Sequence, residues 1–141
     1  MTLHPQFEKD CIVLGKFELC HLLLMNDRQY PWCILVPDRD DIKEIYELSD
    51  KDQIQLSRES ALLAAGMMKL FAGDKMNIAA LGNVVAQLHI HHIVRFKTDP
   101  AWPAPVWGKL PAQAYDQAAL AAIIQQLRGQ FTDSVEWSDA D

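Results

Sequence analysis

The chain has 141 residues, half of them hydrophobic, which is enough for one globular domain with a buried core. Its formal net charge of −6 argues against nonspecific binding of nucleic acid or of an anionic membrane, because both need a basic surface. No apolar run approaches the roughly 18 residues of a membrane span, and the residues at the N-terminus predict no signal peptide. We therefore expect a single domain over residues 1–141, with neither nucleic acid nor a membrane as partner.

The three cysteines, Cys11, Cys20 and Cys33, are odd in number, lie in apolar neighbourhoods and share no spacing typical of a metal site. This pattern predicts buried, reduced thiols. Reduced thiols are typical of a reducing compartment, so the sequence predicts a cytoplasmic protein.

The first third of the chain predicts a helical turn followed by two strands. The turn is expected within residues 3–11, and an apolar strand within residues 17–25. Turn-forming residues 26–31 lead to a second strand over residues 32–36, which Pro37 ends. The two strands are expected to pair as an antiparallel hairpin.

A long helix is predicted in the middle of the chain. Ser49 is a good N-cap, and Asp50 and Asp52 stand in the first turn, where negative charge stabilises a helix. Apolar residues then recur at helical spacing to about Ala72, and Gly73 follows as a C-terminal stop.

Two further strands are expected after this helix. Residues 76–80 form the first, and Val84 leads into the second after a connection around Gly82. If that connection is a tight hairpin, Asn77 lies opposite Gln87.

The second of these strands contains three of the five histidines of the chain. Side chains alternate between the two faces of a strand, so Gln87, His89 and His91 share one face and His92 projects to the other. Buried polar groups without partners cost about 1–3 kcal/mol each. We therefore interpret the row of Gln87, His89 and His91 as a functional site.

The last third predicts an extended arm and a final helix. Residues 100–108 contain three prolines and two tryptophans, which favours an arm packed over the domain or over a partner chain. Residues 114–128 predict an amphipathic helix that ends at Gly129, and the acidic tail from Ser134 is expected to fray.

Two histidines spaced i, i+2 on a strand suit three roles. A metal site needs further ligands, and no carboxylate, cysteine or other histidine stands at a suggestive spacing, so we predict neither metal nor cofactor. Nucleophilic and acid–base catalysis needs no metal and suits a phosphoryl centre, because water can hydrolyse a phosphorylated imidazole. The third role, core histidines bonded to backbone carbonyls, is disfavoured by the neighbouring Gln87 and Asn77.

Residues 82–93 resemble the signature of the histidine triad (HIT) superfamily, in which histidines alternate with apolar residues shortly after a glycine. Residues 34–37 resemble the family's apolar strand ending in proline, and the resemblance covers about residues 15–108. It implies an α+β, HIT-like fold: a mainly antiparallel sheet of about five strands, one long helix and a C-terminal helix. That last helix and the acidic tail occupy residues 109–141.

The resemblance also implies roles for individual residues. His89 matches the middle histidine, the nucleophile that takes the nucleoside monophosphate, and His91 matches the last one, which contacts phosphate and assists the leaving group. Nucleotide-binding roles fall to Asn77 at the phosphate, Asn83 near the scissile phosphate and Asn26 at the ribose.

Three positions depart from the family pattern. Gln87 replaces the first histidine of the triad and carries no proton at neutral pH; it is expected to orient His89 or to bind a phosphate oxygen. Val84 replaces a hydroxyl residue that touches phosphate, and Trp32 replaces a further histidine.

The resemblance therefore predicts a nucleotide hydrolase or nucleotidyl transferase that acts on a nucleoside phosphate ester, anhydride or phosphoramidate through a covalent histidine intermediate. The alternative is a nucleotide-binding module that has lost efficient catalysis. The resemblance also implies a homodimer, with the arm of residues 102–108 near the active site or the dimer partner.

Overall fold

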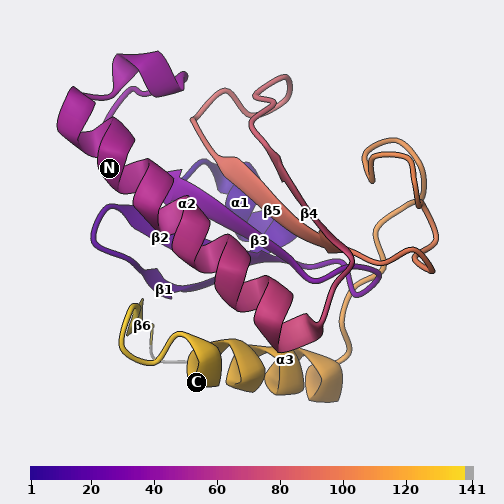
Figure 1. Ribbon diagram of the computed structural model, residues 1–141. Helices are drawn as coiled ribbons and strands as arrows, with labels where there is room; N and C mark the ends of the chain where they lie inside the picture. Colours follow the sequence, from indigo (N-terminus) through magenta and orange to yellow (C-terminus); the bar gives the residue numbers. More distant parts are fainter. Residues whose placement is uncertain (139–141) are drawn as a thin grey trace.

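The computed structural model describes residues 1–138, and these form one six-stranded antiparallel sheet with three α-helices (Figure 1). The strand order is β4-β5-β3-β2-β1-β6. The elements in chain order are α1 (Pro5–Asp10), β1 (Cys11–Lys16), β2 (Cys20–Met25), β3 (Trp32–Pro37), a 3-10 turn (Ile45–Glu47), α2 (Asp50–Phe71), β4 (Lys75–Ala79), β5 (Ile90–Arg95), α3 (Gln117–Gln130) and β6 (Glu136–Trp137).

The structure confirms the α+β fold with a mainly antiparallel sheet, a long helix and a C-terminal helix, and the sheet has six strands where about five are expected. The sheet includes β1, where the sequence predicts no strand, and β6, which lies in the tail that is expected to fray. Gly15 explains this pairing, because a Cβ there would lie 2.4 Å from the Glu136 carbonyl oxygen. Only glycine allows the tail to approach β1 so closely.

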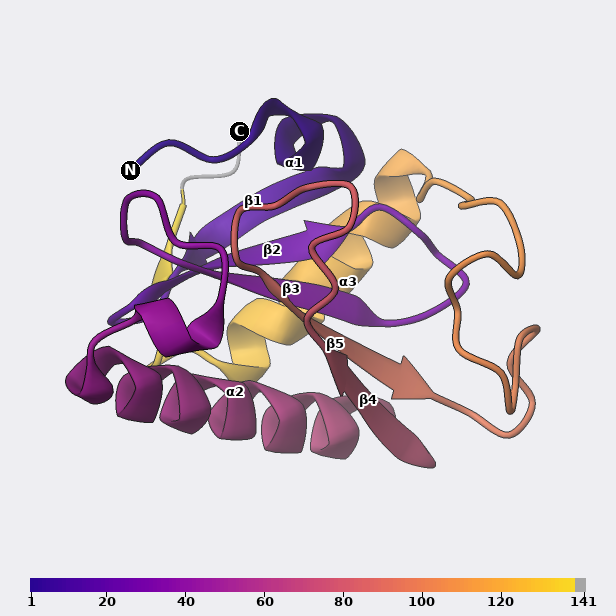
Figure 2. The same ribbon diagram turned by 90° about the horizontal axis from the view of Figure 1, so that it is seen from above.

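Each face of the sheet buries its own apolar cluster. On one face, Leu63 and Met67 of α2 and Leu127 of α3 pack on the sheet. The other face is covered by α1 and by the arm after β5, so α1 and α2 lie on opposite sides of the sheet (Figure 2). Strand alternation divides β3 accordingly: Leu35 joins the helix-covered face, and Ile34 the other.

Helix α2 begins and ends close to the predicted residues. The Ser49 hydroxyl accepts a hydrogen bond from the Asp52 N–H at 3.1 Å, which confirms the N-cap. The left-handed residue at the C-terminal end is Ala72, with φ 51°, and not Gly73. Glycine is needed at position 73 for a steric reason instead, because a Cβ there would lie 2.3 Å from a Val94 methyl group.

The predicted tight hairpin between β4 and β5 is wrong. The two strands do pair, but Asn77 lies opposite Ile93 and not Gln87. Residues 80–89 form a long connection, and β5 begins only at Ile90. Within that connection the Leu88 N–H donates to the Ile42 carbonyl, so this segment pairs with the chain before α2 and leaves β4.

The three cysteines are free and buried, as the sequence predicts. Burial raises the pKa of Cys11 and of Cys33 to about 12, so both stay thiols at neutral pH. Among residues 1–138 there is no helix of the length and apolar character that crossing a membrane requires.

Candidate active site

The two histidines that the sequence assigns to one face do lie together. The rings of His89 and His91 are 4.9 Å apart, and both side chains are more than nine-tenths buried. His92 projects to the opposite face, where its Nε2 lies 2.7 Å from the Ser60 hydroxyl of α2. The alternation expected for this strand is confirmed, although His89 itself precedes β5.

His89 is held by the backbone of its own segment. Its Nδ1 lies 2.7 Å from the Gln87 carbonyl oxygen, and because a carbonyl only accepts, Nδ1 carries the hydrogen. The ring of Phe7, from α1, packs edge-on against it at 4.9 Å. Burial lowers the pKa of His89, and the hydrogen bond to the carbonyl offsets part of that effect. His89 is therefore neutral at neutral pH, with Nε2 unprotonated.

His91 lies between two tryptophans. The Trp32 indole N–H donates to His91 Nδ1 at 3.0 Å. The ring of Trp107, from the arm, packs edge-on against the same imidazole at 5.0 Å. The pKa of His91 is lowered to about 3, mainly by burial and also by the nearby His89 and His92. His91 is thus a neutral imidazole at neutral pH.

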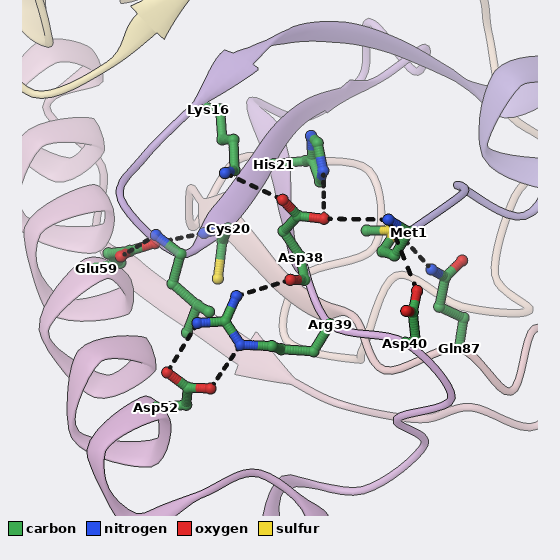
Figure 3. Close-up of polar contacts among 11 residues, drawn as sticks. Met1, Lys16, Cys20, His21, Asp38, Arg39, Asp40, Asp52, Glu59 and Gln87 are labelled. Carbon is green, nitrogen blue, oxygen red and sulfur yellow. Dashed lines mark hydrogen bonds and ion pairs between the residues drawn. The ribbon is translucent and has the colours of Figure 1, made fainter.

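The hydrogen bond between Gln87 and His89 is made by the Gln87 backbone carbonyl, and the Gln87 side chain bonds elsewhere. Its side-chain oxygen accepts from the His4 N–H at 2.8 Å, and its side-chain nitrogen donates to the Thr2 carbonyl at 3.2 Å. The same nitrogen lies 3.3 Å from the Met1 sulfur, and Figure 3 shows the side chain turned toward Met1. The glutamine side chain therefore anchors the N-terminal segment.

The three asparagines lie in different surroundings, and one of them shares a pocket with the histidine pair. Asn83 lines the same pocket as His89 and His91. The Asn77 side-chain oxygen accepts from the Arg95 guanidinium at 2.9 Å. That of Asn26 accepts from the Tyr115 N–H at 3.0 Å, and Asn26 lines a neighbouring pocket.

A pocket of about 410 Å³ opens beside the histidine pair. Most of the pocket lining is apolar. The lining residues come mainly from α1, the ends of β1 and β2, the connection before β5 and the arm. The apolar residues include Phe7, Cys11, Met25, Ile34, Val85 and Trp107. The sequence did not indicate Phe7 or Met25 as site residues. Helical periodicity is weak in an element as short as α1, and Met25, at the end of the apolar strand β2, carries no local signal of a site.

The arm packs over the chain's own site, which confirms one of the two placements predicted for it. Val106 is buried in the cluster on the histidine face, and Trp107 contacts both Trp32 and His91. At the base of the arm the Asp99 carboxylate accepts from the backbone N–H groups of Ala101 and Trp102.

A metal site receives no support from the geometry. Among the residues that the structure describes, no three histidine, cysteine, aspartate or glutamate side chains come together as a metal-binding group. Instead, His89 Nδ1 is hydrogen-bonded to the Gln87 carbonyl, and His91 Nδ1 accepts from the indole N–H of Trp32.

Comparisons with known proteins agree with the fold and with the histidine motif. The chain superposes on a histidine triad protein from Marinobacter aquaeolei VT8 with a TM-score of 0.92 and 50% identity, covering 95% of this chain and 98% of that one. A histidine triad protein from Sinorhizobium meliloti 1021 superposes with a TM-score of 0.89 and 45% identity, covering 92% of this chain and 96% of that one. A histidine triad protein from Bradyrhizobium japonicum superposes with a TM-score of 0.89 and 40% identity, again covering 92% of this chain and 96% of that one.

A HIT-like protein from Bartonella henselae shares the fold at a TM-score of 0.63 and 12% identity, covering 89% of this chain and 90% of that one. No curated protein matches the chain. The HIT domain family model matches residues 6–98, which include the whole histidine segment. The chain therefore belongs to the HIT domain family, whose members are in general nucleotide-binding proteins, nucleotide hydrolases or transferases.

Proposed function

We propose that the protein is a nucleotide hydrolase or nucleotidyl transferase that acts on a nucleoside phosphate ester, anhydride or phosphoramidate through a covalent intermediate on His89. The observation that carries this proposal is the hydrogen bond of 2.7 Å from His89 Nδ1 to the Gln87 carbonyl. It keeps the other ring nitrogen, Nε2, unprotonated and available as a nucleophile. The ring also lines a pocket of about 410 Å³, a volume suited to a small molecule.

In the first step, His89 Nε2 forms a bond to the α-phosphorus while the bond from phosphorus to the leaving group breaks. The imidazole becomes positively charged, and the Gln87 carbonyl stabilises this charge because Nδ1–H donates to it. His91 donates a hydrogen bond to the phosphate or the leaving group, where negative charge develops. Water, or a second acceptor, then attacks phosphorus, breaks the P–N bond and releases the nucleotide.

The nucleoside would occupy the apolar part of the pocket, where Phe7 and Met25 offer surface for a base. Asn83 lies on the same pocket and would contact the phosphate. Asn77 and Asn26 stay predicted nucleotide ligands. Their side-chain oxygens already accept hydrogen bonds within the protein, so the amide NH₂ of each is the group that would meet a nucleotide.

The test is turnover of dinucleoside polyphosphates and adenosine phosphoramidates by the wild-type protein and by His89→Ala. We expect turnover by the wild type and a loss of at least about a thousandfold in the variant, because the nucleophile is gone. His21→Gln is the matched control, since His21 lies beside Asp38, away from the pocket. Equal turnover by wild type and His89→Ala would refute the assignment of His89.

The second candidate is a nucleotide-binding module without efficient catalysis. Three features favour it: Gln87 and Trp32 stand where the family pattern predicts histidines, and Val84, where the pattern predicts a hydroxyl residue, is 92% exposed. It predicts mononucleotide binding in calorimetry without a covalent adduct. A nucleotidyl adduct on His89, detected by mass spectrometry of protein quenched without acid, would exclude it.

The homodimer and the cytoplasmic location stay predictions. Strand β4 lies at the edge of the sheet and exposes half of the Ile78 side chain, which supports association of two copies through this edge. Light scattering of the purified protein measures the oligomeric state directly, and a monomer at micromolar concentration would refute the homodimer.

A further inference from the structure

The hydrogen bond between Trp32 and His91 determines which nitrogen of His91 carries the hydrogen. The Trp32 indole N–H lies 3.0 Å from His91 Nδ1, and both side chains are buried, at 6% and 5% exposed. An indole nitrogen donates and never accepts. His91 Nδ1 must therefore offer its lone pair, and the neutral ring carries its one hydrogen on Nε2.

We propose that Trp32 is a positioning residue that locks His91 as the neutral Nε2–H tautomer, so that His91 donates a hydrogen bond to the leaving group but does not protonate it. This inference rests on the proposed function and narrows its substrate class. Leaving groups that depart as stable anions, such as the phosphates of anhydrides and acidic phenols, are favoured over amines and alkoxides.

His91 does not protonate the leaving group because loss of the Nε2 hydrogen from the neutral ring is unfavourable. The ring would become an imidazolate anion in an apolar, buried site, which is a costly species. The proton would have to be replaced through Nδ1, and the group bonded there is an indole, which does not titrate at neutral pH. A histidine at position 32 could return a proton to His91 Nδ1, but the indole of Trp32 cannot.

The other groups around His91 do not supply a proton either. His89 uses Nδ1 for the Gln87 carbonyl and Nε2 for the attack on phosphorus. His92 faces the opposite side of the sheet, against Ser60. Asp10, the carboxylate on the pocket, accepts a hydrogen bond from the Gln6 side chain at 2.8 Å.

The reaction balances without a proton donor when the leaving group is a stable anion. The bond from His89 Nε2 to phosphorus forms, the P–O bond breaks, and the leaving oxygen keeps the electron pair under a hydrogen bond from His91. In the second step water forms the new P–O bond, the P–N bond breaks, and the proton of water is released to solvent. An amine leaving group must instead be protonated from solvent before it departs.

The tautomer is measured directly by NMR of protein with ¹⁵N-labelled histidine, without any substrate. We expect the His91 hydrogen on Nε2 in the wild type and in Trp107→Phe, which loses an aromatic neighbour of the same ring but no hydrogen bond to it. Trp32→Phe is expected to populate both tautomers. A wild-type His91 with its hydrogen on Nδ1 overturns the proposal, whether or not the variants fold.

Leaving-group dependence tests the consequence, with aryl esters of adenosine monophosphate as probes. We expect the p-nitrophenyl ester to react at least about a hundredfold faster than the phenyl ester, because an unprotonated leaving group makes the rate follow its acidity. Equal rates for the two esters overturn the proposal. If the wild type cleaves neither ester and forms no adduct while His91 carries its hydrogen on Nε2, the proposed function fails and the tautomer assignment stands.

Where Trp32→Phe does not fold, β-(3-benzothienyl)alanine at position 32 replaces the N–H by sulfur in a ring of nearly the same shape. Loss of the single Nε2–H tautomer in that variant supports the role of the indole N–H. A tautomer unchanged from the wild type overturns it.

Discussion

Arg95→Met tests whether a buried ion pair holds the arm that brings Trp107 to the site. The Arg95 side chain is 1% exposed, and its guanidinium donates to both oxygens of Asp99 at 2.8 and 3.0 Å. It also donates to Asn77 at 2.9 Å. Asp99 in turn accepts backbone N–H groups at the base of the arm. Methionine keeps much of the side-chain length and removes the charge and all the donors.

The expected cost is large because Asp99 would remain buried without its cation. Burial alone raises the pKa of Asp99, but the hydrogen bonds from Arg95 and from three backbone N–H groups outweigh it, so the pKa lies below its ordinary value. Removing one partner of a buried pair costs about 3–5 kcal/mol. For a domain of this size that corresponds to a fall in Tm of about 10–20 °C.

The assay is urea denaturation at pH 7 of the wild type, Arg95→Met and Arg39→Met. Arg39 is the matched control, because it also binds a carboxylate through two nitrogens, that of Asp52, but is 47% exposed. Its loss is expected to cost at most about 1 kcal/mol. If Arg95→Met is no less stable than Arg39→Met, the ion pair does not hold the arm as argued.

Three further predictions concern stability. Glu59→Ala is expected to lower the free energy of unfolding by about 3–5 kcal/mol in urea denaturation, since two buried backbone N–H groups at the start of β2 lose their carboxylate acceptor; an unchanged midpoint would contradict this. Gly66→Ala is expected to cost about 1–3 kcal/mol in the same assay, because the new Cβ would lie 2.4 Å from the Phe131 ring; a helix stabilised by alanine would show that α3 moves aside. Burial lowers the pKa of His91 to about 3 and of His92 to about 4, so the unfolded chain binds protons first as the pH falls below about 6.5. The stability that the two neutral histidines contribute is fully present above that pH, and it falls by about 1.4 kcal/mol per pH unit for each histidine down to about pH 4. His92→Val should therefore reduce the slope of unfolding free energy against pH measured between pH 6 and pH 5. An unchanged slope would refute the lowered pKa of His92.

Local chemistry along the chain was enough to predict the long helix and the two faces of the histidine strand. The Ser49 cap, the acidic first turn and the apolar period determine α2 with few distant contacts. Alternation along a strand is a property of the backbone itself, so the separation of His89 and His91 from His92 also followed from the sequence. The same motif, with its glycine and apolar neighbours, was enough to indicate the family.

The register between strands could not be predicted in the same way. Asn77 lies opposite Ile93 because residues 80–89 pair with the segment before α2, a contact between parts of the chain that are distant in sequence. Strand β6 depends likewise on Gly15, whose missing side chain admits the tail, and no local pattern in two residues indicates such a pairing.

At the site itself, the sequence by itself determined which residue types are present, and the tertiary structure decided how they are connected. The resemblance predicts that Gln87 replaces a triad histidine, yet its side chain binds the N-terminal segment, and its backbone carbonyl accepts the hydrogen bond from His89. The resemblance likewise predicts that Trp32 replaces another histidine, and its N–H bonds to His91, 59 residues further along the chain. A hydrogen bond depends on distances of a few tenths of an ångström, and such distances between remote residues arise only when the whole chain is packed.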